Sequence, residues 1–256
     1  MKSKGYDPIK LTKTTEKIVI DGNKRKYANL ARHLRFYGGT ISATEVGCNL
    51  RCKFCFSDDP VRKPATTGKF YSPTEVFNVL TKKAKKHNTK LISASASEGT
   101  LGKQHLFELL ELVDQSEFIY ILETNGMTIG NDPLFAKQLS KFKNLHVRVS
   151  IKGCSKEEYT MLTNANSESY NFPYKALEYL IKNKVSCNAC LSISFSDKKD
   201  IKIAEKRLYD IMPGILKSLE KEYITMFPKV QKRLNKYSIH PRKIRRFGKI
   251  VKYRRT

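Results

Sequence analysis

The feature that most constrains the fold is a regular alternation of short apolar segments with segments of helical periodicity along most of the chain. The predicted strands span 39–46, 91–95, 118–124, 145–152 and 185–195, and a last apolar segment at 223–227 supplies a sixth. Strands separated by helices of about ten to fifteen residues pair in parallel, with right-handed crossovers. The sequence therefore predicts an α/β fold in the form of a partial (β/α)6 TIM-like barrel.

Helix-capping patterns support this alternation. Ser72-Pro73-Thr74-Glu75 combines an N-cap serine, a proline at the first helical position and a capping-box glutamate. Asp132 predicts another helix start, and Ser155-Lys156-Glu157-Glu158 predicts a second capping box. Two further helices are expected over about 103–113 and 173–181.

The 256 residues, of which 40% are hydrophobic, suffice for one substantial core. We expect an N-terminal segment at 1–35, the barrel at 36–228 and a basic C-terminal tail at 229–256. No stretch is long and apolar enough to cross a membrane, so no membrane partner is expected. Because Met1 to Tyr6 leads directly into polar sequence, no signal peptide is expected and the predicted location is cytoplasmic.

Three closely spaced cysteines, Cys48, Cys52 and Cys55, carry the strongest chemical signal. Thiolates suit iron–sulfur clusters, and a cubane normally uses four, so three of them leave one iron without a protein ligand. Structural zinc is the alternative, but the remaining cysteines lie far downstream. A disulfide is disfavoured without export to an oxidising compartment. The spacing favours an open iron–sulfur cluster over zinc.

The cysteine segment resembles that of the radical S-adenosylmethionine (radical SAM) superfamily, in which the residue before the last cysteine is usually aromatic, here Phe54. Three later segments also resemble superfamily motifs in the expected order. They are Ser95-Ala96-Ser97-Glu98-Gly99-Thr100, Leu122-Glu123-Thr124-Asn125-Gly126 and Val147-Arg148-Val149-Ser150-Ile151-Lys152-Gly153. The pattern looks closest to archaeal-type members related to glycyl-radical-enzyme (pyruvate formate-lyase) activating enzymes.

One segment departs from the superfamily pattern. Ala96 and Ser97 stand where the family has paired glycines, and Gly99 stands where it has proline. The added side-chain atoms obstruct the backbone approach that glycine permits. The acidic residue Glu98 is retained, so we expect an active site, with a non-catalytic homologue as the alternative.

The motif residues converge in the predicted fold. Cys48, Glu98, Asn125 and Lys152 follow successive strands, and ligands of parallel α/β sheets bind beyond the carboxyl ends of the strands. In the strand at 145–152, Arg148, Ser150 and Lys152 share the face opposite the apolar residues, because side chains alternate along a strand. We expect this polar face to line the barrel interior; whether Arg148 instead reaches solvent at the rim stays open.

The resemblance implies two cofactors, a [4Fe-4S] cluster held by the three cysteines and S-adenosylmethionine. It implies reductive cleavage of S-adenosylmethionine to a 5′-deoxyadenosyl radical, which abstracts hydrogen from the substrate. Glu98 is expected to accept hydrogen bonds from the amino group, Ser150 and Lys152 to hold the carboxylate and ribose, and Phe54 to pack near the adenine. Asn125 belongs to the same cofactor-binding set. The expected partner is a reductant such as ferredoxin or flavodoxin, and the substrate stays open among a protein glycine, an RNA base and a small metabolite.

The net charge of +25 is unevenly distributed, since residues 229–256 hold 12 Lys or Arg and no acidic residue. Interleaved cations and aromatic rings are typical of RNA contact, although basic termini are also often solvated tails. The alternative function is therefore a non-catalytic iron–sulfur or zinc protein that binds nucleic acid.

Cys187 and Cys190 lie three apart in a strand and point to opposite faces, so we expect them to be buried and to fill apolar space. A second cluster that includes Cys154 is the alternative.

Overall fold

A nine-stranded sheet organises the molecule, which is described by a computed structural model covering residues 5–253. The strands of this sheet are β1 (Ile20–Asp21), β2 (Lys24–Leu34), β3 (Thr40–Glu45), β4 (Lys69–Tyr71), β5 (Leu91–Ser95), β6 (Ile119–Thr124), β7 (Leu145–Ile151), β8 (Cys187–Ser192) and β9 (Glu220–Glu222), while β10 (Lys243–Arg246) and β11 (Lys249–Lys252) form a separate two-stranded sheet. Six of them, β3, β5, β6, β7, β8 and β9, lie side by side in this order and pair in parallel. The predicted partial barrel of six β/α units is confirmed.

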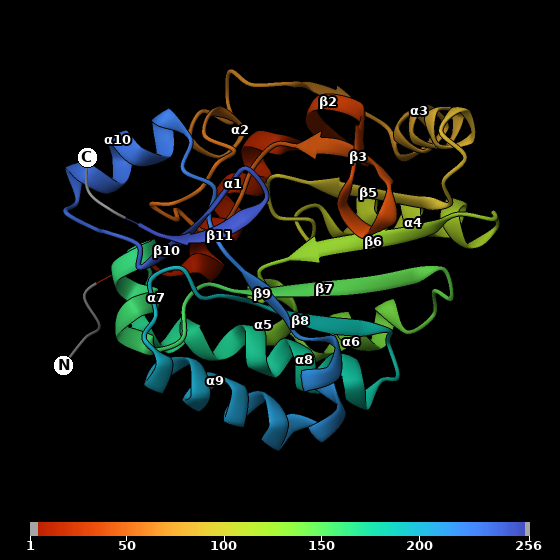
Figure 1. Ribbon diagram of the computed structural model, residues 1–256. Coiled ribbons are helices and arrows are strands. Elements are labelled where there is room, and N and C mark those ends of the chain that lie inside the picture. Colours follow the sequence, from red (N-terminus) through yellow and green to blue (C-terminus); the bar gives the residue numbers. More distant parts are fainter. Residues whose placement is uncertain (1–4, 254–256) are drawn as a thin grey trace.

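Helices cover the outside of this curved sheet, and others lie at the end of the barrel toward which its parallel strands point (Figure 1). They are α1 (Pro8–Val19), α2 (Asp59–Arg62), α3 (Pro73–Lys86), α4 (Lys103–Asp114), α5 (Met127–Asn131), α6 (Pro133–Leu139), α7 (Lys156–Thr163), α8 (Phe172–Lys182), α9 (Lys198–Ile211) and α10 (Pro228–Lys236), with short 3-10 turns at Phe36–Gly38, Ser167–Asn171 and Pro213–Ser218. The predicted capping box of Ser72 and Glu75 is present at the start of α3. Within the described residues, no helix has the length and apolar character needed to span a bilayer.

Side chains divide between the two faces of the sheet as the two-residue repeat of a strand requires. Apolar residues on the outer face pack with the helices in one continuous core. They include Ile41 and Ala43, Ile92 and Ala94, Tyr120 and Leu122, Val147, Val149 and Ile151, and Ala189 and Leu191. The inner face is left with the polar set, so the barrel interior is lined by groups able to bind a polar ligand.

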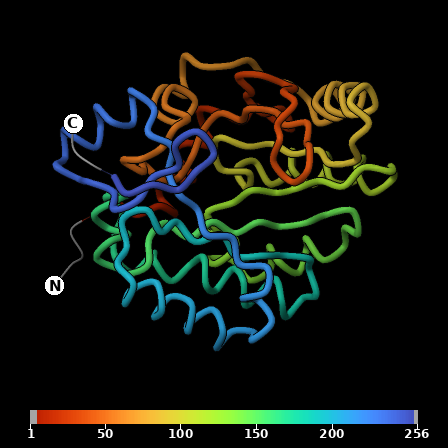
Figure 2. The backbone as a smooth tube through the Cα atoms, in the orientation of Figure 1, coloured from red at the N-terminus to blue at the C-terminus, as the bar shows by residue number. Residues whose placement is uncertain are grey.

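The described segments that flank the barrel in sequence both contact it, and the blue C-terminal segment lies on the left of Figure 2. Strand β2, from the predicted N-terminal segment, pairs antiparallel with β3 and extends the sheet. The basic C-terminal residues form α10 and the antiparallel hairpin of β10 and β11. The arrowheads of β3 and β6 point toward the side of Figure 1 on which α10 and the hairpin lie. The boundaries expected after residues 35 and 228 stay predictions; both flanking segments contact the barrel.

Two local predictions were wrong. The sixth parallel strand lies at Glu220–Glu222 and not at 223–227, because the charged residues Glu220 and Glu222 face the barrel interior and need not be apolar. The second capping box is incomplete. Ser155 accepts a hydrogen bond from the Glu158 N–H, but the Glu158 carboxylate binds the Cys154 N–H at 2.6 Å instead of returning to Ser155.

Candidate active site

The three cysteines lie on a loop of residues 47–58, here called the cysteine loop, which leaves the carboxyl end of β3. Gly47 opens it with φ +95°, and a Cβ there would lie 2.9 Å from Thr15 Cγ2, so only glycine fits. The Glu98 N–H donates to the Gly47 carbonyl at 3.1 Å, which joins this loop to the segment after β5. On its other side, Asn49 Nδ2 donates to Thr12 Oγ1 of α1 at 3.0 Å. The loop is therefore held by elements distant in sequence.

The thiols are shielded, and two basic side chains act on Cys52. Cys52 is 8% exposed, and Cys48 and Cys55 are half-buried. Burial raises the pKa of the Cys52 thiol to about 11, against the opposing influence of Lys152 and Arg62. The same two cations would stabilise an anionic thiolate-bound cluster, so the donor set and its surroundings fit an iron–sulfur centre.

Within residues 5–253, no three His, Cys, Asp or Glu side chains converge as a site for a single metal ion. The finding covers Cys154, Cys187 and Cys190 as well, so the described residues hold no preformed single-ion site there.

Glu98 is fully buried at the end of β5 and accepts four hydrogen bonds. Oε1 receives Thr100 Oγ1 and Thr124 Oγ1, both at 2.6 Å, and the Thr100 N–H at 3.2 Å. Oε2 receives the Asn125 N–H at 2.8 Å. Oε2 accepts a single hydrogen bond, so it keeps an acceptor position that a cofactor amino group could use. The predicted contact with that amino group stays a prediction, and the observed role of Glu98 is to join the segments after β5 and β6.

Ala96 occupies the first position at which the superfamily pattern has glycine, and its φ is +73°. This left-handed conformation costs a residue with a Cβ roughly 1–2 kcal/mol. The backbone has thus kept a glycine-like shape after the glycine was replaced. The geometry of the segment survives with local strain.

Asn125 links the cysteine loop to the segment after β6. Its Nδ2 donates to Asn49 Oδ1 at 2.7 Å and lies 3.8 Å from Cys48 Sγ. Its Oδ1 accepts the Met127 N–H at 3.1 Å. Of the predicted cofactor residues, Asn125 and Glu98 therefore lie beside the first cysteine.

Ser150 and Lys152 lie together on the inner face of β7, with Lys152 Nζ donating to Ser150 Oγ at 2.6 Å. Burial alone would lower the pKa of Lys152, but the charges of Glu222 and Cys52 outweigh it, and the pKa is raised. Burial alone would likewise raise the pKa of Glu222, but Lys152 and Arg148 lower it to about 2. Both groups are charged at neutral pH, and they line the barrel below the cysteine loop.

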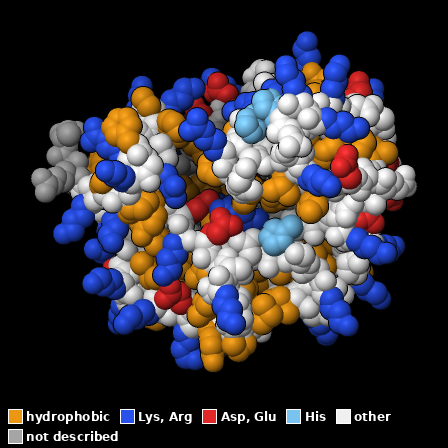
Figure 3. Space-filling view, turned by 45° about the vertical axis from the view of Figure 1, so that its right-hand side comes forward, with side chains coloured by type: hydrophobic (Ala, Val, Ile, Leu, Met, Phe, Trp, Pro, Cys, Tyr) orange, Lys and Arg blue, Asp and Glu red, His pale blue; other side chains and the backbone are white. Residues whose placement is uncertain are grey.

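Arg148 lies inside the barrel and not at a solvent-exposed rim, which answers the question that the sequence left open. Its Nη2 contacts Glu220 Oε2 at 2.9 Å and Glu222 Oε1 at 2.8 Å. Glu123 lies beside it in the β6–β7 register and accepts a hydrogen bond from Tyr37 Oη at 3.0 Å. Figure 3 shows acidic and basic side chains at the bottom of a hollow on one face of the molecule.

Phe54 points toward the C-terminal segment. Its ring centroid lies 5.6 Å from that of Phe195, and Phe54 packs against the apolar cluster that includes Phe195 and Val230 and Leu234 of α10. The expected packing of Phe54 near an adenine stays a prediction. In the structure, the aromatic residue before the last cysteine anchors the loop to α10.

Sequence reasoning missed two arginines that hold the segments carrying the predicted site residues. Arg25 of β2 is fully buried and donates to the carbonyls of Glu98 and Leu101, each at 2.7 Å, while forming an ion pair with Glu45 at 3.1 Å. Arg233 of α10 donates to carbonyls of the cysteine loop. Neither arginine lies in a motif, so no spacing or pattern indicated its role.

Comparison with known proteins agrees with this geometry. The family model described as the radical SAM superfamily matches residues 44–201, more than half of the chain. The fold and site define a partial barrel with cysteine-bearing loops at the carboxyl ends of its strands. The chain belongs to the radical SAM superfamily.

The similar proteins are longer than this chain. A Methanocaldococcus jannaschii protein, named provisionally as a glycyl-radical-enzyme activating enzyme, is 26% identical over 128 residues, which cover 50% of this chain and 45% of that protein. Streptococcus suis SuiB bound to S-adenosylmethionine has a TM-score of 0.55 at 15% identity, covering 77% of this chain and 42% of SuiB. AnSMEcpe with bound S-adenosylmethionine has a TM-score of 0.50 at 21% identity, covering 73% of this chain and 55% of anSMEcpe. These structures share the fold, and the chain spans about half the length of the relatives it matches.

Proposed function

We propose that this chain is a radical SAM enzyme that binds a [4Fe-4S] cluster through Cys48, Cys52 and Cys55 and cleaves S-adenosylmethionine reductively. The observation that carries the proposal is the convergence of the cysteine loop, Asn125 and the Ser150–Lys152 pair at the carboxyl ends of β3, β6 and β7. When bound, the cluster and S-adenosylmethionine supply a 5′-deoxyadenosyl radical for hydrogen abstraction.

The residues of this chain provide placement and electrostatics. Lys152 is a half-buried cation suited to a carboxylate, and Ser150 beside it offers a hydroxyl for a second polar group. Glu98 fixes the distance between two cofactor-binding segments through its four hydrogen bonds. Tight placement is required because a primary carbon radical attacks the nearest C–H bond.

The substrate class is not assigned. A protein glycine is favoured over an RNA base or a small metabolite by one observation, the provisional name of the Methanocaldococcus jannaschii relative. A reductant is required for cleavage, and ferredoxin or flavodoxin is the proposed donor. RNA contact by the tail stays a prediction, and α10 is packed against the barrel.

Anaerobic reconstitution tests the proposal. The wild-type chain should bind iron and sulfide with a brown chromophore, and with dithionite and S-adenosylmethionine it should release 5′-deoxyadenosine and methionine. A variant with all three loop cysteines replaced by alanine is the matched control and should do neither. A colourless wild-type protein that binds zinc would support the non-catalytic alternative and overturn the proposal.

A further inference from the structure

The C-terminal helix α10 contacts the cysteine loop through one arginine. Arg233 Nε donates to the Lys53 carbonyl at 2.8 Å, and Nη2 donates to the Cys55 carbonyl. Its third group, Nη1, pairs with Asp58 Oδ1 at 2.7 Å. A guanidinium presents its donors in a fixed planar fork, so three simultaneous acceptors define one orientation of the loop.

Asp58 connects the end of the cysteine loop to the same helix. Lys229 Nζ lies 3.0 Å from Asp58 Oδ2, and Arg62 Nη2 donates to the Cys52 carbonyl at 2.8 Å. Asp58 adopts φ +49°, a conformation that residues with a Cβ rarely adopt. Both basic residues of α10 pair with Asp58, but of the two only Arg233 also donates to carbonyls of the cysteine loop.

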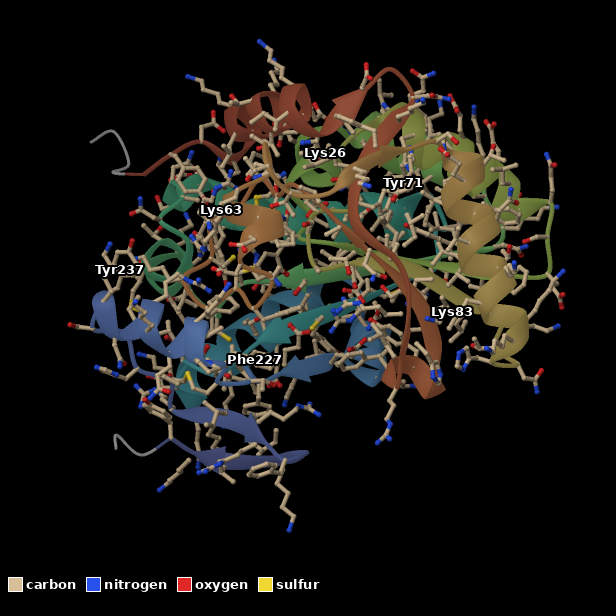
Figure 4. The ribbon with its side chains drawn as sticks, turned by 90° about the horizontal axis from the view of Figure 1, so that it is seen from above. Lys26, Lys63, Tyr71, Lys83, Phe227 and Tyr237 are labelled. Atoms are coloured by element: carbon tan, nitrogen blue, oxygen red, sulfur yellow. The ribbon has the colours of Figure 1, made fainter. Side chains whose placement is uncertain are left out.

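Apolar packing accompanies these polar contacts. Leu162, Phe195, Val230, Leu234 and Ile239 form a buried cluster against which Phe54 packs. On the outer side of the loop, Lys53 Nζ lies 4.6 Å from the centre of the Tyr237 ring. Figure 4 shows Phe227 and Tyr237 at the two ends of α10, on the side of the molecule that also holds Lys63. The helix thus covers the loop instead of extending into solvent.

The direction of the two carbonyls has a consequence for the loop interior. In a trans peptide the N–H points opposite to the carbonyl. Carbonyls of Lys53 and Cys55 that turn toward Arg233 therefore turn the N–H groups of Phe54 and Phe56 away from it. Within residues 5–253, neither N–H has an acceptor, so both are free to donate to cluster sulfurs.

We propose that Arg233 is a positioning residue that fixes the cysteine loop in its cluster-binding orientation and places a cation beside the centre. This role rests on the proposed function, since it concerns the same cluster. In this proposal, the main role of the basic C-terminal segment is to cover the cysteine loop. Hydrogen bonds to the sulfurs and net positive charge nearby both raise the reduction potential of an iron–sulfur centre.

Three variants of the full chain test the proposal. Arg233→Met removes the guanidinium and keeps the apolar stem, whereas Arg233→Lys keeps the charge but cannot reach three acceptors. Lys229→Met is the matched control, because Lys229 pairs with the same Asp58, is 67% exposed and donates to no loop carbonyl. Circular dichroism first confirms that each variant is folded.

The first readout is hydrogen exchange of the reduced protein without cluster. The amides of Lys53 and Cys55 are protected by the carbonyls of Leu162 and Cys52. In Arg233→Met we expect these amides to exchange at least about 10-fold faster, because hydrogen bonds from a charged donor are lost. Lys229→Met should exchange like the wild type. Unchanged exchange in Arg233→Met would overturn the proposal.

The second readout is the reduction potential of the reconstituted cluster, measured by redox titration with electron paramagnetic resonance. Arg233→Met should titrate at a more negative potential than the wild type, with Arg233→Lys between them. Faster exchange with an unchanged potential would reduce Arg233 to an ordinary structural contact and also overturn the proposal. If the wild type binds no cluster, the proposed function fails, and the exchange experiment alone decides whether Arg233 holds the loop.

Discussion

Replacing Glu98 by glutamine is the sharpest test of how the segments after β5 and β6 are joined. The substitution keeps the shape of the side chain but changes one acceptor oxygen into an NH₂ donor. The hydroxyls of Thr100 and Thr124 can reverse and accept, but the N–H groups of Thr100 and Asn125 cannot. Each carboxylate oxygen receives one of these N–H groups. Whichever way the glutamine side chain is turned, its NH₂ group therefore faces a backbone N–H, and the two donors cannot bond to each other.

The expected loss of stability follows from this conflict. A buried backbone donor left without an acceptor, together with a lost charge-assisted bond, costs about 2–3 kcal/mol. For a chain of this size, that loss lowers Tm by about 4–12 °C. Because Glu98 is fully buried, solvent does not screen the effect.

Urea denaturation of the reduced, metal-free protein measures the loss. Glu117→Gln is the control, since Glu117 is 57% exposed and pairs with Lys90 at 3.5 Å. We expect the control to change the free energy of unfolding by less than about 0.5 kcal/mol. A loss of that small size in Glu98→Gln would refute the assignment of Glu98 as the buried link between β5 and β6.

Three further outcomes are expected. Burial of Glu45 raises its pKa to about 7 despite the Arg25 cation. The contribution of protonated Glu45 to stability is therefore complete below about pH 4.5 and is lost as pH rises through 7. In urea titrations at several pH values, the free energy of unfolding of Glu45→Gln relative to the wild type should increase between these two pH values. Ala96→Gly should relieve the positive φ and stabilise the protein by about 0.5–1 kcal/mol in the same assay, and destabilisation would contradict the strain. Gly99→Ala should destabilise by about 1–3 kcal/mol, because its Cβ would lie 2.8 Å from the Glu123 carbonyl oxygen; an unchanged midpoint would show that the backbone moves easily.

The elements predicted best from sequence are those whose pattern is local. The strand at Leu91–Ser95 and the capping box of Ser72 and Glu75 have the predicted bounds, because alternation and capping depend on neighbouring residues. The sixth strand was misplaced because Glu220–Glu222 faces a polar interior and lacks the apolar signal of a buried strand. A rule based on hydrophobicity cannot find such a strand.

The residues of the candidate site likewise fall into those that the sequence predicted and those that it did not. The cysteines, Glu98 and Asn125 follow strands, and the parallel order of those strands brought them together as expected. The roles of Arg25 and Arg233 could not be predicted from the sequence, because both arginines bind backbone carbonyl oxygens. Every residue carries such an oxygen, so no sequence pattern indicates which ones are bound. The same applies to the internal use of the Glu98 carboxylate, which depends on two threonines and a backbone amide.

The contact between Arg233 and the Lys53 carbonyl joins residues 180 positions apart, which has a consequence for biosynthesis. A ribosome releases the N-terminal cysteines long before the helix that orients them has been made. During that interval the nascent chain exposes reduced thiols without their cover. If the chain binds the proposed cluster, its assembly is expected to follow the synthesis and docking of α10.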